Sequence, residues 1–292
     1  MIDKLKEYIK LIRVRQWYKN LVVFLALIFS FKLLSSVDLI NVILSFFAVS
    51  FMASASYIIN DLKDVAKDKL HPEKCKRPLA SGKVSKLEGL LLFTLVITLS
   101  LAIGSLLGNN VLILLGSFFV LNLLYTFMLK KIMFADILAI SSLFVLRAIV
   151  GAYAISLSIS PWLILCPFFL ALFLAVAKRR SDLILLKNNH GEEHIKSKGI
   201  LTGYNLNITN SLMNISTTLL IISYALYCFL SNKEILMFTI PFALFVIFDY
   251  YKLVLENSEI VRQPDKIIKS PSLLIGSLLW LGFTVLLLYL HI

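Results

Sequence analysis

The chain has 292 residues, of which 59% are hydrophobic and 16% charged, and its formal net charge is +12. A soluble domain carries about 25% charged residues. The composition, with a mean hydropathy of +0.87, therefore excludes a soluble globular protein and leaves no room for a separate soluble domain. The three cysteines, Cys75, Cys166 and Cys228, show no paired spacing, so we expect neither a disulfide nor a zinc site.

The N-terminal segment is basic, and the apolar run that follows it has no small-residue cleavage site, which argues against a cleavable signal peptide. Apolar side chains recur on one helical face of this segment: Ile2, Leu5, Tyr8, Ile9 and Ile12. The pattern predicts an interfacial helix over residues 1–17 that leads into the first span.

Apolar runs of about 20 residues recur along the chain, which is the length that crosses a bilayer. We expect an all-α, polytopic membrane protein with nine transmembrane helices in a single domain over 1–292. The expected spans are 18–36, 39–59, 87–107, 110–129, 134–156, 161–177, 208–230, 235–252 and 271–291. The longer polar connections at 60–86 and 178–207 are expected to be cytoplasmic loops.

The basic residues indicate the orientation of these spans. Of the 29 Lys and Arg residues, 26 lie in the N-terminal segment or after the second, fourth, sixth and eighth spans. Positive residues stay in the cytoplasm, so we expect a protein of the cytoplasmic membrane with its N-terminus inside and its C-terminus outside. The net charge then describes the cytoplasmic face of the protein rather than its whole surface, and we expect no nucleic-acid partner.

Acidic residues stand at the cytoplasmic end of the second span. Asn60, Asp61, Asp64 and Asp68 fall on one face of a helix that should end before Pro72. Like charges near the negative end of a helix are unfavourable unless a cation is present. Hard oxygen ligands suit Mg²⁺, which binds substrate phosphates. The alternative is a solvated helix end whose acids are neutralised by nearby lysines: Lys63, Lys67 and Lys69.

Basic and polar residues gather in the same loops and form a candidate set for binding an anionic substrate. The set comprises Arg15, Gln16, Lys19, Asn20, Lys74, Arg77, Tyr125, Lys130, Lys178, Arg179 and Arg180. Each group taken alone could be a snorkelling anchor at the membrane surface. Their occurrence in four loops on one face, one of them acidic, favours an anionic substrate.

Arg147 lies inside the fifth span, and Asp136 lies at the cytoplasmic mouth of the same span. An intramembrane arginine usually faces a polar cavity or a partner. A central cavity open to the cytoplasm would account for both residues, and we expect Arg147 to approach a bound phosphate there. The alternative is a structural pair with a buried acid or a backbone carbonyl.

These residues resemble the UbiA superfamily of intramembrane transferases, whose motif NDxxDxxxD stands here at 60–68. The stretches RVRQWYKNLVVF, DxxHPxKxxRPLASG, LRAIVGAYA and AKRRSDL resemble its decaprenyl-phosphate phosphoribosyltransferase branch. The resemblance implies transfer of 5-phosphoribose from phosphoribosyl diphosphate to a polyprenyl phosphate. It implies Mg²⁺ on Asn60, Asp61, Asp64 and Asp68, with Asp61, Asp64, Asp68 and Asp136 as catalytic residues. A homo-oligomer is compatible with the sequence.

One departure from the wider superfamily bears on the donor. Prenyltransferases of this superfamily generally carry a second DxxxD motif after the sixth span, whereas this chain has Asp182 with no acid four residues on. One acidic cluster suggests one metal-bound diphosphate. A prenyltransferase remains the main alternative, and an anionic-solute transporter is a more distant one. The DGxxAR pattern of CDP-alcohol transferases is absent from the sequence.

Overall fold

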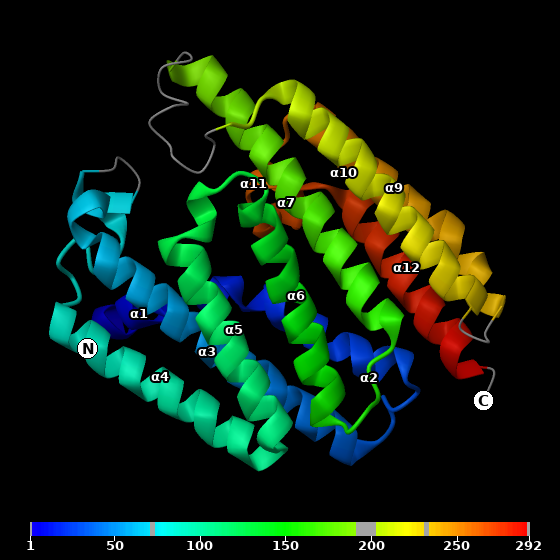
Figure 1. Ribbon diagram of the computed structural model, residues 1–292, viewed down its shortest axis with the longest axis horizontal. Helices are drawn as coiled ribbons and strands as arrows, with labels where there is room; N and C mark the ends of the chain where they lie inside the picture. Colours follow the sequence, from blue (N-terminus) through cyan, green and yellow to red (C-terminus); the bar gives the residue numbers. More distant parts are fainter. Residues whose placement is uncertain (1, 71–73, 191–202, 231–233, 291–292) are drawn as a thin grey trace. The chain divides into compact units, whose positions relative to one another are not determined.

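The computed structural model describes residues 2–70, 74–190, 203–230 and 234–290 (Figure 1). Every regular element within these ranges is helical, which confirms the all-α prediction. The motif residues 71–73 and much of the loop expected at 178–207 lie outside the described residues. The elements are α1 (Ile2–Leu11), η1 (Val14–Phe24), α2 (Leu25–Phe29), α3 (Ser36–Lys69), η2 (Lys74–Lys76), α4 (Lys86–Leu107), α5 (Asn109–Phe127), η3 (Leu129–Lys131), α6 (Ala135–Ala154), α7 (Pro161–His190), α9 (Leu206–Leu230), η4 (Glu234–Thr239), α10 (Ile240–Leu255), α11 (Glu259–Arg262), η5 (Pro264–Lys269) and α12 (Pro271–Leu290), the η elements being 3₁₀ helices.

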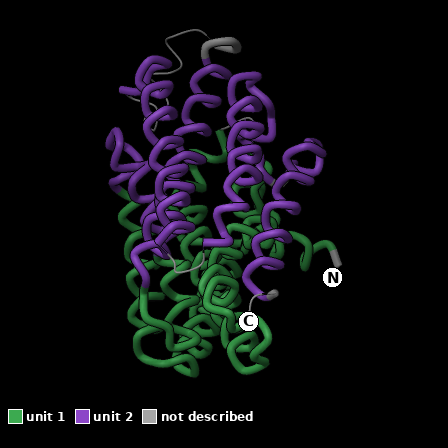
Figure 2. Tube along the Cα trace, turned by 90° about the vertical axis from the view of Figure 1, so that its right-hand side faces the viewer, with its two compact units in different colours: residues 1–127, 146–159 green, residues 128–145, 160–292 purple. Residues whose placement is uncertain are grey.

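The chain forms two compact units, which Figure 2 shows in different colours. Unit 1 contains residues 1–127 and 146–159, and unit 2 contains residues 128–145 and 160–292. Helix α6 therefore contributes its first part to unit 2 and its second part to unit 1. The single domain expected over 1–292 stays a prediction.

Helix α3 is the central element of unit 1 and packs against η1, α4 and α5. Its N-cap is Ser35, whose side chain accepts a hydrogen bond from the backbone N–H of Asp38. Small buried residues follow one another along it: Ser45, Ala48, Ser50, Ala53, Ser54, Ala55 and Ser56. Small side chains let membrane helices approach closely, and Ser100 of α4 donates a 2.7 Å hydrogen bond to the carbonyl of Ala48.

The spans other than the first agree with the sequence prediction to within a few residues at most ends. Eight helices among the described residues are long and apolar enough to cross a membrane. Proline and serine explain several helix starts: Ser85 and Glu88 form a capping box at the start of α4, and Pro161 and Pro271 open α7 and α12. The chain is an integral membrane protein.

The span expected at 18–36 is not one regular helix, because η1 and the five-residue α2 occupy this region. Contacts to α3 hold η1 in this form. Trp17 donates from Nε1 to Ser54 Oγ over 3.1 Å, and Ser54 in turn donates to the carbonyl of Ile12 over 2.7 Å. A ninth regular span is therefore not present in the described residues, and the number nine stays a prediction.

Helix α7 continues well beyond the end expected for the sixth span, so residues 178–190 are helical rather than part of a loop. The extension is stabilised by its own side chains. Leu183 and Leu186 pack with Tyr204 in a small buried cluster, and Arg179 is buried against Asp136. The sequence prediction of a loop was wrong here because these long-range partners are invisible in a local charge pattern.

Unit 2 is built from helices that pack in pairs, α7 with α9 and α10 with α12. Figure 1 shows these four helices in yellow-green to red. Their shared core contains Phe173, Met213, Tyr250 and Leu273. The ring centres of Phe173 and Tyr250 lie 5.4 Å apart, so this core contains an aromatic contact in addition to buried apolar surface.

Candidate functional site

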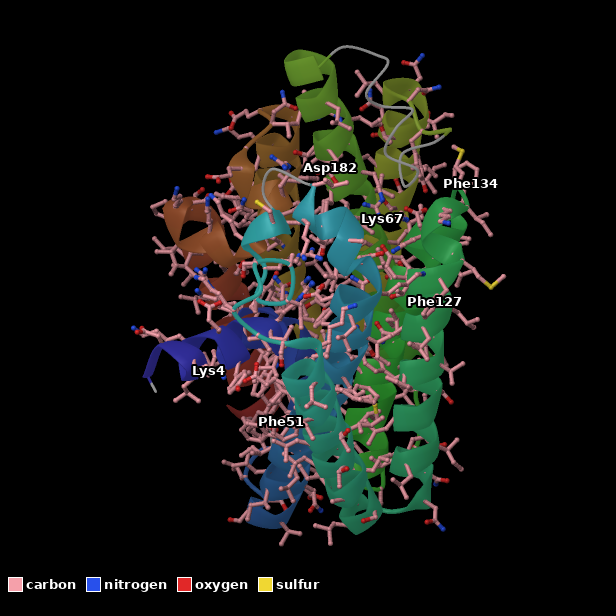
Figure 3. All side chains as sticks on the ribbon, turned by 90° about the vertical axis from the view of Figure 1, so that its left-hand side faces the viewer. Lys4, Phe51, Lys67, Phe127, Phe134 and Asp182 are labelled. Atoms are coloured by element: carbon pink, nitrogen blue, oxygen red, sulfur yellow. The ribbon has the colours of Figure 1, made fainter. Side chains whose placement is uncertain are left out.

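Two aspartates at the end of α3 are almost completely buried, with Asp61 at 3% and Asp68 at 4% exposure. They lie seven residues apart, two helical turns, and so share a face as predicted. Arg77 joins them, because its Nη1 lies 2.9 Å from Asp61 Oδ1 and 2.7 Å from Asp68 Oδ2. The helix ends at Lys69, which confirms that it stops before Pro72. Figure 3 labels Phe51 in the apolar part of α3 and Lys67 near this end.

A second guanidinium reaches the same cluster from Arg13, which was not among the predicted site residues. Arg13 Nη2 lies 2.5 Å from Asp61 Oδ1, and the guanidinium carbon lies 4.7 Å from the centre of the Tyr57 ring. The backbone of Arg13 has a φ of 54°, a left-handed conformation that is uncommon for a residue with a side chain. Strained backbone of this kind clusters at functional sites, and it was not visible in the sequence.

The chemistry of the acidic cluster is suited to Mg²⁺. Its donors are carboxylate oxygens, which are the ligands that a hard divalent ion prefers. Among the described residues, however, no group of three or more His, Cys, Asp or Glu side chains converges as a metal site requires. The cluster instead holds guanidinium groups between its carboxylates. The donor chemistry fits Mg²⁺, and the ion would have to replace contacts that Arg13 and Arg77 make here.

The remaining predicted residues of unit 1 divide into two groups. Those that are exposed or half-buried are Arg15, Gln16, Lys19, Asn60, Asp64, Lys74 and Tyr125. Asn20 is 2% exposed and is hydrogen-bonded inside the protein, where it donates from Nδ2 to Ser50 Oγ over 2.9 Å. Its side-chain oxygen accepts a 2.7 Å hydrogen bond from Arg147 Nε. One partner of Arg147 is therefore the neutral amide of Asn20, and an approach to phosphate stays a prediction.

Asp136, predicted to be catalytic, is fully buried in unit 2 and both of its oxygens are engaged. Arg179 Nε donates to Oδ2 over 2.7 Å, and the Tyr204 hydroxyl donates to Oδ1 over 2.6 Å. The Tyr204 oxygen accepts from the backbone N–H of Phe134 over 3.0 Å. These contacts give Asp136 and Arg179 a role in holding α6, α7 and the segment before α9 together.

The other basic residues at this end of α7 also have protein partners. Arg180 donates from Nε to Asn210 Oδ1 over 2.8 Å and from Nη1 to the carbonyl of Val254 over 2.7 Å. Arg262 of α11 lies 3.2 Å from Asp182 Oδ1, and it was not predicted. Lys178 is exposed, and Lys130 lies half-buried in η3.

The family model described as the UbiA prenyltransferase family matches residues 21–263. The chain belongs to this family. It is 32% identical to the decaprenyl-phosphate phosphoribosyltransferase of Mycolicibacterium smegmatis over 229 residues, which cover 77% of this chain and 71% of the relative. The protein of that name from Mycobacterium tuberculosis is 32% identical over 228 residues, covering 76% and 73%. An uncharacterized protein of Sinorhizobium fredii is 29% identical, and the match covers 74% of this chain but 42% of that protein.

Solved structures of UbiA homologues share the fold. A homologue from Archaeoglobus fulgidus bound to GPP and Mg²⁺ matches with a TM-score of 0.73 at 18% identity, over 97% of this chain and 99% of that one. A digeranylgeranylglyceryl phosphate synthase matches with a TM-score of 0.63 at 21% identity, over 97% and 99%. At this level of identity the likeness shows the fold alone.

The bridging role of Arg77 predicts that Arg77→Met destabilises the protein on the order of 3 kcal/mol, because two buried carboxylates lose their shared cation. Mg²⁺ should restore more stability to this variant than to the parent, since the ion no longer competes with the guanidinium. Thermal unfolding in detergent, with Mg²⁺ and with chelator, measures both effects. Lys76→Met, one residue away and exposed, is the control. If Arg77→Met unfolds at the same temperature as the parent and is not stabilised by Mg²⁺, Arg77 does not bridge the two carboxylates as described.

Tyr204→Phe should destabilise unit 2 by about 1–3 kcal/mol, because one oxygen of buried Asp136 loses its donor. Burial raises the pKa of the Tyr204 phenol above its ordinary value of about 10. The stability that the hydroxyl contributes should therefore be complete below about pH 10 and decline only as the pH rises toward the raised pKa. Chemical denaturation across this range checks the effect. Tyr251→Phe, which removes a hydrogen bond to exposed Asn214, should cost less, and an equal cost in both variants would argue against the buried network.

Proposed function

We propose that the chain transfers 5-phosphoribose from phosphoribosyl diphosphate to a polyprenyl phosphate, with release of diphosphate, in a Mg²⁺-dependent reaction. The observation that carries the proposal is the pairing of Asp61 and Asp68 with Arg13 and Arg77. Ligands for a metal and ligands for a phosphate stand within one cluster. The two mycobacterial relatives, at 32% identity, bear the name of this activity.

The reaction requires little covalent chemistry from the protein. The bond between C1 of ribose and the diphosphate oxygen breaks, and a bond between C1 and an oxygen of the lipid phosphate forms. The lipid phosphate is already anionic, so no general base is needed. The residues of the cluster bind and orient the diphosphate, and positioning accounts for much of the acceleration.

Within the cluster, Arg13 and Arg77 are suited to bind phosphate oxygens, because a guanidinium presents a planar set of donors. Asp61, Asp64 and Asp68 would hold Mg²⁺, with Asn60 beside them. When bound, the ion supplies charge neutralisation to the departing diphosphate. Lys19, Arg15, Gln16, Lys74 and Tyr125 stay predicted substrate-binding residues of unit 1. Lys130, Lys178, Arg179 and Arg180 stay predicted substrate-binding residues of unit 2, although the last two have the protein partners described above.

A prenyltransferase is the second candidate, since a solved neighbour carries GPP and Mg²⁺. The end of α7 argues against it. Asp182 is accompanied by arginines, with Arg262 at 3.2 Å and Arg179 at 3.9 Å, rather than by a second acid four residues on. A lone carboxylate with no second acid four residues on supplies too few oxygen ligands for a second metal.

The deciding measurement is a transfer assay with purified protein, Mg²⁺, labelled phosphoribosyl diphosphate and a polyprenyl phosphate. We expect transfer with this donor and none from geranylgeranyl diphosphate to a small acceptor. Asp64→Asn should lower the rate more than tenfold, because a metal carboxylate is lost. Asp3→Asn, which alters an exposed acid on α1, should have no effect. Thermal stabilisation by geranylgeranyl diphosphate and not by phosphoribosyl diphosphate would make prenyl transfer the better interpretation.

We further propose that the acidic end of α3 faces the cytoplasm, with the N-terminus inside and the C-terminus outside. The proposal rests on the distribution of the 26 basic residues and on the rule that such residues remain inside. A reporter that is active only in the cytoplasm, fused after Ile292, should be silent. If that fusion is active, the region of η1 and α2 does not cross the bilayer in the way the nine-span prediction requires.

A further inference from the structure

The first segment that was expected to cross the membrane has an unusual backbone, since η1 is a 3₁₀ helix of 11 residues. Runs of 3₁₀ helix longer than three or four residues are uncommon because their hydrogen-bond geometry is poorer than that of an α-helix. Such a segment needs support from its neighbours. It is also the segment that carries Arg15, Gln16 and Lys19, and it begins directly after Arg13.

One support is Gly151 of α6. A Cβ atom at this position would lie 2.0 Å from the carbonyl oxygen of Val23 and 2.9 Å from its carbonyl carbon. No real Cβ contact is so short, and the atoms it would meet belong to backbone and cannot rotate away. The second half of α6 and η1 therefore lie in direct backbone contact, and only glycine permits it.

The other support is Arg147, one helical turn before Gly151 and on the same face of α6. Its Nε donates to Asn20 Oδ1 over 2.7 Å, and its guanidinium carbon lies 4.8 Å from the centre of the Phe118 ring. Arg147 is 5% exposed and Asn20 is 2% exposed, so this hydrogen bond is buried. Asn20 is bound to Ser50 of α3 at the same time, which ties η1 to two helices.

We infer that Arg147 and Gly151 are positioning residues that hold η1 in its 3₁₀ form. They fix where the start of η1 presents Arg15 and Lys19, and where Arg13 meets Asp61. The inference rests on the proposed function where it concerns the rate of transfer. The position of η1 can be measured without any substrate. Arg147 acts through Asn20 and the backbone of η1 and need not touch a phosphate.

Trp17 provides the structural readout, because it lies on η1 and is hydrogen-bonded to Ser54. In a background with Trp162→Phe and Trp280→Phe, its emission and its quenching by iodide report the position of η1. We expect Gly151→Ala to shift both signals and to lower the transfer rate on the order of tenfold to a hundredfold. Gly116→Ala is the matched control, because a Cβ at Gly116 of α5 would have no neighbour within 4 Å.

A double-mutant cycle tests Arg147 and remains decisive if Gly151→Ala fails to fold. Arg147→Leu and Asn20→Leu should each shift the Trp17 signals, and the double variant should shift them by less than the sum of the two single shifts, because the two residues share one hydrogen bond. Unchanged Trp17 signals in folded Gly151→Ala or Arg147→Leu protein would overturn the inference. So would losses in kcat/KM for the donor that simply add in the double variant, since Arg147 would then act on the substrate directly. A shift in Trp17 without phosphoribosyl transfer would count against the proposed function alone.

Discussion

The burial of two carboxylates at the end of α3 is the constraint on which the site depends. An isolated buried charge costs several kcal/mol unless it is paired and hydrogen-bonded. Asp61 and Asp68 meet this requirement through Arg77, which returns from the loop after α3, and through Arg13, which follows α1. The charge on one helix end thus determines the paths of two segments that are distant in sequence.

A cluster neutralised by guanidinium groups can exchange its partners. Each arginine is attracted to carboxylate and to phosphate by the same planar donors, and each carboxylate is attracted to arginine and to a hard cation. A diphosphate with its metal supplies both alternatives together. Unit 2 uses the same chemistry differently: Asp136 is fully buried between Arg179 and Tyr204, with less room for exchange, which suits a structural pair.

The sequence predicted the helix ends well where local chemistry sets them. Apolar run length placed the starts of α4, α7 and α12 within one residue, and in the structure these starts carry the Ser85 capping box, Pro161 and Pro271. The α-helical spacing placed Asp61 and Asp68 on one face. The errors come from tertiary contacts. Lys178 to His190 looked like a loop because the partners of its charges lie far along the chain.

The same limitation applies to the candidate site. Arg13 was missed because a periodic pattern gives no sign of a left-handed backbone, and an arginine at a membrane surface resembles an anchor. For Arg147 the sequence suggested a phosphate, a buried acid or a backbone carbonyl as partner, whereas the structure pairs it with the neutral amide of Asn20. Nothing in the local sequence separates Asn20, which is buried, from Lys19 beside it, because the face that each residue presents depends on the 3₁₀ geometry.

The irregular first segment explains why small residues surround it. Within a bilayer, backbone groups without helical partners must be satisfied by the protein. Ser54 does this for the carbonyl of Ile12, and Gly151 allows α6 to cover the backbone at Val23. An ordinary α-helix would need neither contact. Three residues thus fix the path of one short segment: Arg147, which is buried, Gly151, which has no room for a methyl group, and Ser54, which is bonded to backbone. This path starts at Arg13 in the acidic cluster and continues through η1.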